Sequence, residues 1–234
     1  MDGEALLIAV RREGNALLAA AESDPTASIE HCPDWDIAAM VEHVAGVWTF
    51  MTAQLAAASP DSPTRPERDE SPAAERLDRL VTALAETDPQ TPCWNWCAED
   101  GRRAGWIGRR MAHENAIHRW DVENAVGEAP PIDGDLARDG VDEILDVAWR
   151  YQMRGPVTDY PNSTLHLHCT DGEGEWLLSS EDDSLVVARE HAKGDVAARG
   201  TASELFLLVW GRRPAGIEVF GDEASLAAWL ALTP

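Results

Sequence analysis

Residues 109–121 read Arg-Arg-Met-Ala-His-Glu-Asn-Ala-Ile-His-Arg-Trp-Asp and form the middle of a predicted helix. Glu114 and His118 are four residues apart in this run, so on a helix both side chains point in the same direction. Three apolar or small residues lie within about 60° of that direction: Ile107, Met111 and Ala125. This side of the helix is therefore expected to face a core. A carboxylate and an imidazole are costly to bury there unless they are paired, hydrogen-bonded or bound to a metal ion.

His43 is the candidate for a third metal ligand. It lies in a predicted helix over about residues 37–58, on a flank roughly 120° from the centre of that helix's apolar stripe. From such a flank an imidazole can face a neighbouring helix. With Glu114 and His118 it would complete a three-ligand site with an open position, the arrangement that catalytic metals use. Two alternatives stay open: His43 is a solvated or hydrogen-bonded histidine, and Glu114 with His118 makes only a buried hydrogen bond.

Helical periodicity dominates the chain up to about residue 153. Apolar residues recur at helical spacing in five segments, about 3–23, 37–58, 73–87, 106–126 and 135–153. Asp36 is expected to cap the second of these helices, and Gly127 follows the fourth as a C-terminal glycine does. The proline-rich connection over residues 59–66 is expected to be exposed. These segments predict a helical bundle.

The pattern changes after residue 161. Residues 164–169 alternate polar and apolar side chains, which is typical of a half-buried strand, and residues 171–174 predict a turn. Further strands are predicted at 176–178, 185–187 and 217–220, and helices at 202–210 and 222–230. The sequence thus predicts an α+β protein, with a helical domain over 1–154 and a small α+β domain over 162–234.

His166 and His168 lie on the polar face of the predicted strand over 164–169. Because they are two residues apart, their imidazoles share that face and have a spacing suited to chelation. A polar strand face explains the pair more simply, and this is our interpretation of it.

Composition excludes several classes of partner. With 19 basic and 42 acidic residues, the 234-residue chain carries a formal net charge of −23, which opposes binding to nucleic acid or to an anionic membrane. No apolar run approaches the ~20 residues needed to span a bilayer. The N-terminus lacks the basic start and cleavage pattern of a signal peptide, and the four cysteines do not make a disulfide framework. We expect a cytoplasmic protein without nucleic-acid or membrane partners.

Several motifs carry a resemblance to a known family. They are Cys32-Pro33-Asp34-Trp35-Asp36, Val41-Glu42-His43-Val44, Arg109–Glu114, Ile117–Asp121, Asp139–Glu143, Leu165–Leu178, Gly200–Leu205 and Trp210–Arg212. Together they extend over nearly the full length of the chain, and they resemble the mycothiol-dependent maleylpyruvate isomerase family.

The resemblance implies a DinB-like, up-down four-helix bundle followed by a domain similar to sterol carrier proteins. It also implies a divalent metal, zinc in the isomerase, held at positions that match His43, Glu114 and His118. The cosubstrate mycothiol would enter at the open coordination position. An arginine of the C-terminal domain is associated with activity in the isomerase, and Arg212 is the closest match, with Arg213 as its competitor.

These residues and the resemblance lead us to expect a mycothiol-dependent metalloenzyme. Coordination of the thiol would lower its pKa, and the thiolate would attack an electrophilic small molecule. Cis–trans isomerisation is favoured over S-transfer, and the enzyme is expected to be a monomer or a homodimer. Asp121 lies about 20° from the direction of Glu114 and is expected either to orient a ligand or to make a salt bridge between or along helices.

Other functions match part of the pattern. Two histidines and one carboxylate also suit the non-heme iron oxygenases. A metal-dependent hydrolase would need no thiol. A non-enzymatic metal-binding or ligand-binding regulatory module would keep its fold after chelation and show no turnover.

Overall fold

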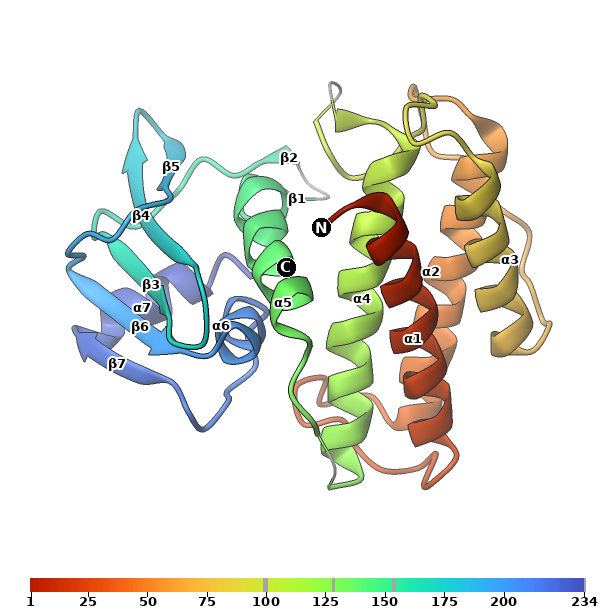
Figure 1. The fold of residues 1–234 in the computed structure, drawn as a ribbon, viewed down its shortest axis with the longest axis horizontal. Coiled ribbons are helices and arrows are strands. Elements are labelled where there is room, and N and C mark those ends of the chain that lie inside the picture. Colours follow the sequence, from red (N-terminus) through yellow and green to blue (C-terminus); the bar gives the residue numbers. More distant parts are fainter. Residues whose placement is uncertain (99–100, 128, 153–154, 234) are drawn as a thin grey trace. The chain divides into compact units, whose positions relative to one another are not determined.

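The computed structural model describes residues 1–98, 101–127, 129–152 and 155–233. The chain divides into two units, Met1–Pro130 and Pro131–Pro234. The first unit is helical, and the second combines helices with a five-stranded sheet (Figure 1). The predicted α+β fold class is confirmed. Within the described ranges, no helix has both the length and the apolar character that crossing a membrane requires.

The division between the units lies earlier than the one expected between residues 154 and 162. Helix α5 (Gly134–Glu143) groups with the second unit because it packs closely against α6 (Ala202–Val209). A Cβ atom on Gly140 would lie 2.4 Å from Cε2 of Phe206, so glycine at this position permits the close contact of the two helices. Helical periodicity identifies the apolar side of a helix but not the element that it packs on.

Four α-helices form the bundle of the first unit within its described residues: α1 (Gly3–Ala21), α2 (Ile37–Ala57), α3 (Ala73–Glu86) and α4 (Ala104–Ala125). Their ends lie close to the predicted ones. As predicted, Asp36 caps α2, because its Oδ1 accepts a hydrogen bond from the Ala39 N–H at 2.8 Å. The bundle predicted from the helical periodicity is therefore present.

The helix directions differ from a simple up-down order. Arg76 at the start of α3 contacts Glu42 at the start of α2, with 3.3 Å between Nη1 and Oε1, so these two helices run parallel. The connection over residues 58–72 makes this possible, because it returns along the bundle before α3 begins (Figure 1). Helix α1 likewise runs parallel to α4, since Asn115 reaches Val10 and Arg119 reaches Glu13.

Asn115 ties three helices together in the core of the bundle. Its Oδ1 accepts a hydrogen bond from Nε1 of Trp48 in α2 at 2.8 Å, and its Nδ2 donates to the carbonyl of Val10 in α1 at 2.9 Å. Asn115 and Trp48 are both fully buried. Because each buried polar atom of the Asn115 amide has a partner, the bond network fixes the rotation of α4. This rotation determines the direction in which Glu114 and His118 point.

The second unit contains α5, a π-helical turn (Ile144–Ala148), the short paired strands β1 (Tyr151–Gln152) and β2 (Gly155–Pro156), strands β3 (Leu165–Cys169), β4 (Glu175–Glu181), β5 (Ser184–Ala188), β6 (Val196–Gly200) and β7 (Glu218–Gly221), and helices α6 and α7 (Glu223–Leu230). The order of strands in the large sheet is β5-β4-β3-β6-β7, with β3 parallel to β6 and the other neighbours antiparallel. The β3–β6 connection passes through β4 and β5.

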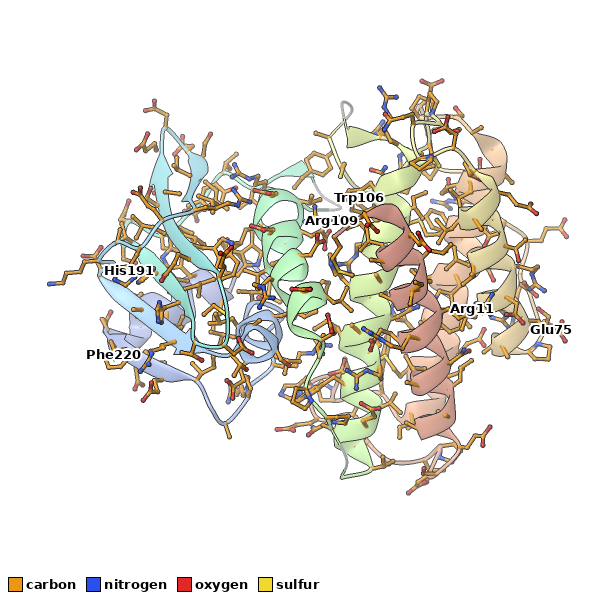
Figure 2. All side chains as sticks on the ribbon, viewed as in Figure 1. Arg11, Glu75, Trp106, Arg109, His191 and Phe220 are labelled. Atoms are coloured by element: carbon orange, nitrogen blue, oxygen red, sulfur yellow. The ribbon has the colours of Figure 1, made fainter. Side chains whose placement is uncertain are left out.

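The two faces of this sheet differ in character. Leu165 and Leu167 of β3 are fully buried, and α6 and α7 pack against β3 and β6. Side chains alternate between the faces of a strand, so His166 and His168 lie on the opposite face. Figure 2 shows His191 and Phe220 on the solvent side of this unit, where both side chains are exposed.

Two elements of the second unit differ from prediction. The helix predicted over 135–153 ends earlier, because the π-helical turn follows α5 directly at Ile144. Strand β6 was not predicted, since Val-Ala-Ala-Arg-Gly carries only one β-branched residue. Its pairing with both β3 and β7 supplies the stability that its own composition lacks.

Candidate metal centre

The three predicted metal ligands come together in the first unit. His43 lies in the first half of α2, and Glu114 and His118 lie on one side of α4. Oε1 of Glu114 is 3.4 Å from Nε2 of His43 and 3.3 Å from Nε2 of His118. The potential ligand atoms of all three residues lie within 4.8 Å of one another. Helix packing thus brings His43 to the pair that the spacing on α4 had already aligned.

The site is buried on one side and accessible on the other. The side chains of Glu114 and His118 are buried, whereas that of His43 is 36% exposed. The ring of Trp35 lies against His43, with 4.8 Å between the ring centroids. The imidazole of His43 is turned toward Glu114, an orientation that fits both a metal ligand and a hydrogen-bonded histidine.

Asp121 orients His118. Its buried carboxylate lies 3.0 Å from Nδ1 of His118, and an ionised carboxylate accepts a hydrogen bond there when Nδ1 carries the proton. Nε2 lies on the side of Glu114; it donates to the carboxylate when it is protonated and offers a lone pair there when it is not. Hydrogen bonding of the second ring nitrogen to a carboxylate is the usual way in which proteins fix the orientation of a metal-binding histidine. This contact agrees with the expectation that Asp121 orients a ligand and also with the alternative of a salt bridge along the helix.

Arg110 is a further residue of the candidate site, and it was not predicted from the sequence. Its Nη2 donates to Oε2 of Glu114 at 2.5 Å, which leaves Oε1 to the two imidazoles. Burial alone would raise the pKa of Glu114, but the charges of Arg110 and His118 and the hydrogen bonds from both histidines hold that pKa well below its usual range. The carboxylate is therefore ionised at neutral pH. The sequence feature that indicates this contact is the four-residue spacing of Arg110 and Glu114 on one helix.

The donor set and its spacing suit a zinc-type ion. Bonds of about 2.0–2.1 Å in a tetrahedral site place neighbouring ligand atoms about 3.3 Å apart. The two contacts of Glu114 Oε1, at 3.3 and 3.4 Å, match this separation. Two imidazoles and one carboxylate would leave the fourth tetrahedral position open.

Arg212 belongs to the second unit, just after α6. Its side chain is buried, and its Nη1 donates to the carbonyl of Trp210 at 2.6 Å. Its backbone N–H donates to the carbonyl of Leu207 at 2.9 Å. These bonds satisfy carbonyl groups at the end of α6. Arg213 is exposed. The substrate contact expected of Arg212 stays a prediction.

Two family models match the chain. The model of the mycothiol maleylpyruvate isomerase N-terminal domain matches residues 7–123, and that of the MDMPI C-terminal domain matches residues 135–228. No match to a curated protein was found.

Two solved structures have a similar fold. The crystal structure of a mycothiol-dependent maleylpyruvate isomerase shares 16% sequence identity with this chain, with a TM-score of 0.61 over 94% of this chain and 93% of that one. The crystal structure of a mutant of that isomerase gives the same TM-score and coverage at 15% identity. At these identities, the likeness shows a shared fold.

The family models carry the assignment. The N-terminal model alone covers half of the 234 residues, and the C-terminal model covers most of the second unit. The family predicted from the sequence motifs is confirmed. The chain belongs to the mycothiol maleylpyruvate isomerase family, a family of enzymes.

Proposed function

We propose that this chain is a mycothiol-dependent metalloenzyme that acts on an electrophilic small molecule. His43, Glu114 and His118 would hold a divalent cation, Zn²⁺ in the first place, and leave one position for the thiol of mycothiol. The observation that carries this proposal is the grouping of the three ligand atoms within 4.8 Å of one another. Membership of the family supports mycothiol as the cosubstrate.

The surrounding residues have positional roles in this proposal. When bound, the cation would lower the pKa of a coordinated thiol, so that thiolate is present near neutral pH without a dedicated base. Asp121 holds the ring of His118 with Nε2 directed to the site. Arg110 keeps the carboxylate of Glu114 charged and directs one of its oxygens away from the imidazoles.

Cis–trans isomerisation is the reaction that we favour. The mycothiol thiolate would add to one carbon of a cis double bond that is conjugated with a carbonyl, and the electron pair would move to that carbonyl. Rotation about the resulting single bond and expulsion of the same thiolate would release the trans isomer, with no net consumption of thiol. A substrate that carries a leaving group would retain the sulfur instead, and the protein would then be an S-transferase.

Arg212 is proposed to bind a carboxylate of the substrate, with Arg213 as the competitor. A chain with a net charge of −23 repels anions at long range, so an anionic substrate needs a local cation. Steady-state measurement of KM for the variants Arg213→Gln and Arg212→Lys distinguishes between the two arginines. Replacing the arginine that binds the substrate should raise KM. A purely structural role of Arg212 would lower the melting temperature and leave KM unchanged.

The decisive experiment offers mycothiol and a panel of electrophiles, including maleylpyruvate, to zinc-loaded protein and follows isomers and thiol adducts by mass spectrometry. His43→Ala should lose zinc and turnover together, because the variant removes one of three ligands. Glu42→Gln is the matched control: it lies next to His43 on α2, its side chain is exposed, and it should keep both properties. Equal turnover by wild type and His43→Ala would contradict the proposal.

Metal analysis and activity assays on the same protein preparation distinguish the proposed function from the three alternatives. An iron content in unsupplemented protein, with oxygen-dependent turnover, would indicate a non-heme oxygenase. Turnover without thiol would indicate a hydrolase. A regulatory module would bind the metal or a ligand and show neither activity.

A further inference from the structure

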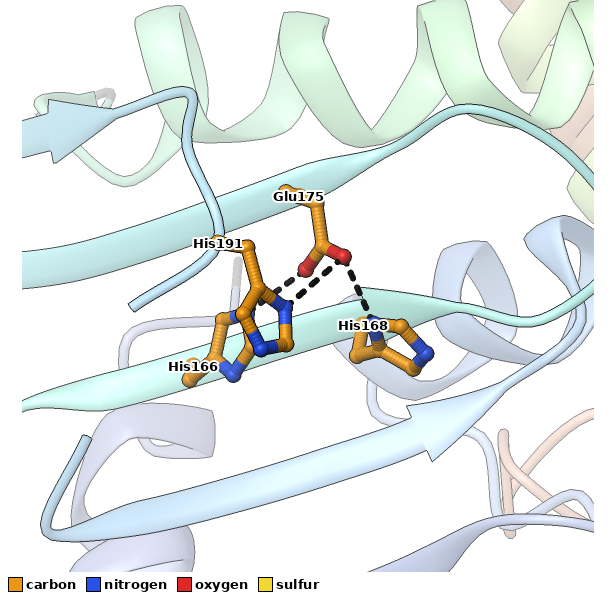
Figure 3. A group of neighbouring side chains, drawn as sticks. All are labelled: His166, His168, Glu175 and His191. Atoms are coloured by element: carbon orange, nitrogen blue, oxygen red, sulfur yellow. Dashed lines mark hydrogen bonds and ion pairs between the residues drawn. The ribbon is translucent and has the colours of Figure 1, made fainter. Parts of the chain in front are cut away.

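A second group of imidazoles surrounds a carboxylate within the second unit. His166 and His168 lie on β3, Glu175 lies on β4, and His191 lies between β5 and β6 (Figure 3). The strand register pairs His168 directly with Glu175, so these side chains are neighbours on one face of the sheet. His166 shares that face because it is two residues from His168. We call these four residues the sheet cluster.

Glu175 is the centre of the sheet cluster. Its Oε2 lies 2.7 Å from Nε2 of His166, and its Oε1 lies 2.7 Å from Nδ1 of His168 and 3.1 Å from Nδ1 of His191. The ring centroids of the three histidines are 5.1–6.0 Å apart. The potential ligand atoms of the four residues lie within 4.8 Å of one another. Both oxygens of one carboxylate therefore hold three imidazoles close together.

A polar strand face does not account for this arrangement. Such a face would leave His166 and His168 in contact with solvent, yet the side chain of His166 is buried. His191 comes from a different segment and also turns toward Glu175, although its side chain is 74% exposed. The earlier interpretation of His166 and His168 as a simple polar strand face is therefore incomplete.

The four donors suit a borderline transition-metal ion. Neutral imidazoles favour Zn²⁺, Ni²⁺, Co²⁺ and Cu²⁺, and a single carboxylate offsets half the charge of a divalent ion. For an ion to bind, the nitrogens now facing Glu175 must carry lone pairs, so any proton there has to move to the other ring nitrogen or leave. His168 and His191 are both accessible to solvent, which makes this exchange feasible.

The surroundings permit entry of an ion. A surface hollow of about 340 Å³ is lined by His166, His191 and Lys193, among others. Arg199 of β6 pairs with His168 in the register and brings a positive charge to the same face. Glu218 compensates that charge, since its Oε2 lies 2.9 Å from Nη1 of Arg199.

We propose that His166, His168, Glu175 and His191 form a second divalent-metal site, distinct from the centre in the helical bundle. The ion would be of the zinc class. With four protein ligands a tetrahedral ion has no open position, which is typical of structural sites rather than catalytic ones. Its effect would be to fix the segment that carries His191, residues 189–195, to β3 and β4. This proposal does not depend on the proposed function of the bundle.

Zinc stoichiometry of the purified full chain tests the proposal, measured by competition with a chromophoric chelator and by native mass spectrometry. Wild type should bind two equivalents of Zn²⁺. His43→Ala should bind one, His191→Ala should bind one, and the double variant none. Lys193→Ala is the matched control, because it lies two residues from His191 in the same exposed segment and is not a ligand; it should bind two.

Failure of either proposal has its own signature. If His43→Ala binds no zinc, or if His191→Ala and Glu175→Gln bind as much as wild type does, the sheet site is overturned. If wild type and His43→Ala both bind one equivalent and His191→Ala binds none, the bundle centre fails and the sheet site stands. Far-UV circular dichroism of His191→Ala checks that the fold is retained, which the exposure of this residue leads us to expect. Zinc should also protect residues 189–195 from limited proteolysis in wild type but not in His191→Ala.

Discussion

The bundle centre and the sheet cluster use similar donors in different settings. In the bundle, helices α2 and α4 supply three potential ligands, and the buried guanidinium of Arg110 balances the charge of the carboxylate. In the sheet, two neighbouring strands and a connecting segment supply four potential ligands, and the imidazoles themselves surround the carboxylate. A buried three-ligand site with an open position suits chemistry, whereas a more exposed four-ligand site suits the fixing of a segment. The number of potential ligands and their burial, rather than their identity, would distinguish the two proposed roles.

The largest expected difference between the regions concerns the two carboxylates. Glu114→Ala removes the carboxylate that the buried Arg110 contacts, so we expect a loss of about 3 kcal/mol in the free energy of unfolding of metal-free protein. Glu175→Ala should cost only about 1 kcal/mol, because its side chain is 25% exposed and its partners can be neutral imidazoles. Urea unfolding of both variants measures the difference. Equal losses would mean that burial does not separate the two clusters.

Asp121→Asn tests whether the orientation of His118 matters for the proposed metal site in the bundle. The variant replaces the carboxylate that accepts the hydrogen bond from His118, so zinc affinity at the bundle centre should fall by about 10-fold to 100-fold. The measurement is best made in the His191→Ala background, in which the bundle site is counted alone. The sheet site, measured in the His43→Ala background, should keep its affinity when Asp121→Asn is added. A loss at both sites would indicate a general effect on folding.

The dependence of zinc affinity on pH should be steeper for the sheet. Protons compete with the metal for each imidazole, so below the histidine pKa the affinity should fall by up to about a thousandfold per pH unit with three imidazoles and about a hundredfold with two. In the bundle, burial lowers the pKa of His118, but the charge of Glu114 and the hydrogen bond to Asp121 raise it more. Proton competition at His118 should accordingly begin above the pH at which an ordinary histidine titrates. Titrations of the two single-site variants between pH 5 and 8 test both statements, and equal slopes would argue against three imidazole ligands in the sheet.

The smallest effect is expected from Arg199→Gln. The variant removes a cation from the face that carries the sheet cluster and leaves Glu218, so zinc affinity should increase. Because Arg199 and Glu218 are exposed, water screens the change, and we expect a gain of less than about threefold. Chelator competition in the His43→Ala background measures it. A decrease in affinity would mean that Arg199 supports the sheet cluster rather than opposing it.

Much of the bundle was predictable because its signals are local. Helical spacing aligned Glu114 with His118, and the cap at Asp36 marked the start of the helix that carries His43. The contact of Arg110 with Glu114 was also readable from the same four-residue spacing, but a charged pair on a helix is common at surfaces and gave no reason to place it in the site.

The sheet cluster was only half predictable. The alternation in β3 put His166 and His168 on one face, which the structure retains. Glu175 joined them through the register of β3 with β4, and His191 joined them through the path of a connecting segment. Register depends on the turn and on the packing of the whole face, so it is not encoded in the strand that contains the two histidines.

The amino-acid sequence alone determined that the chain has a helical part followed by a part with both helices and strands. It also determined the family motifs and the contacts between side chains three or four residues apart on one helix. These features depend on backbone periodicity, which acts over a few residues. Tertiary structure decided that α2 and α3 run parallel, that α5 packs on α6, and that His43 and His191 approach carboxylates far away in the chain. Such contacts depend on which apolar surfaces bury each other, and many pairings of similar helices and strands satisfy the same local pattern.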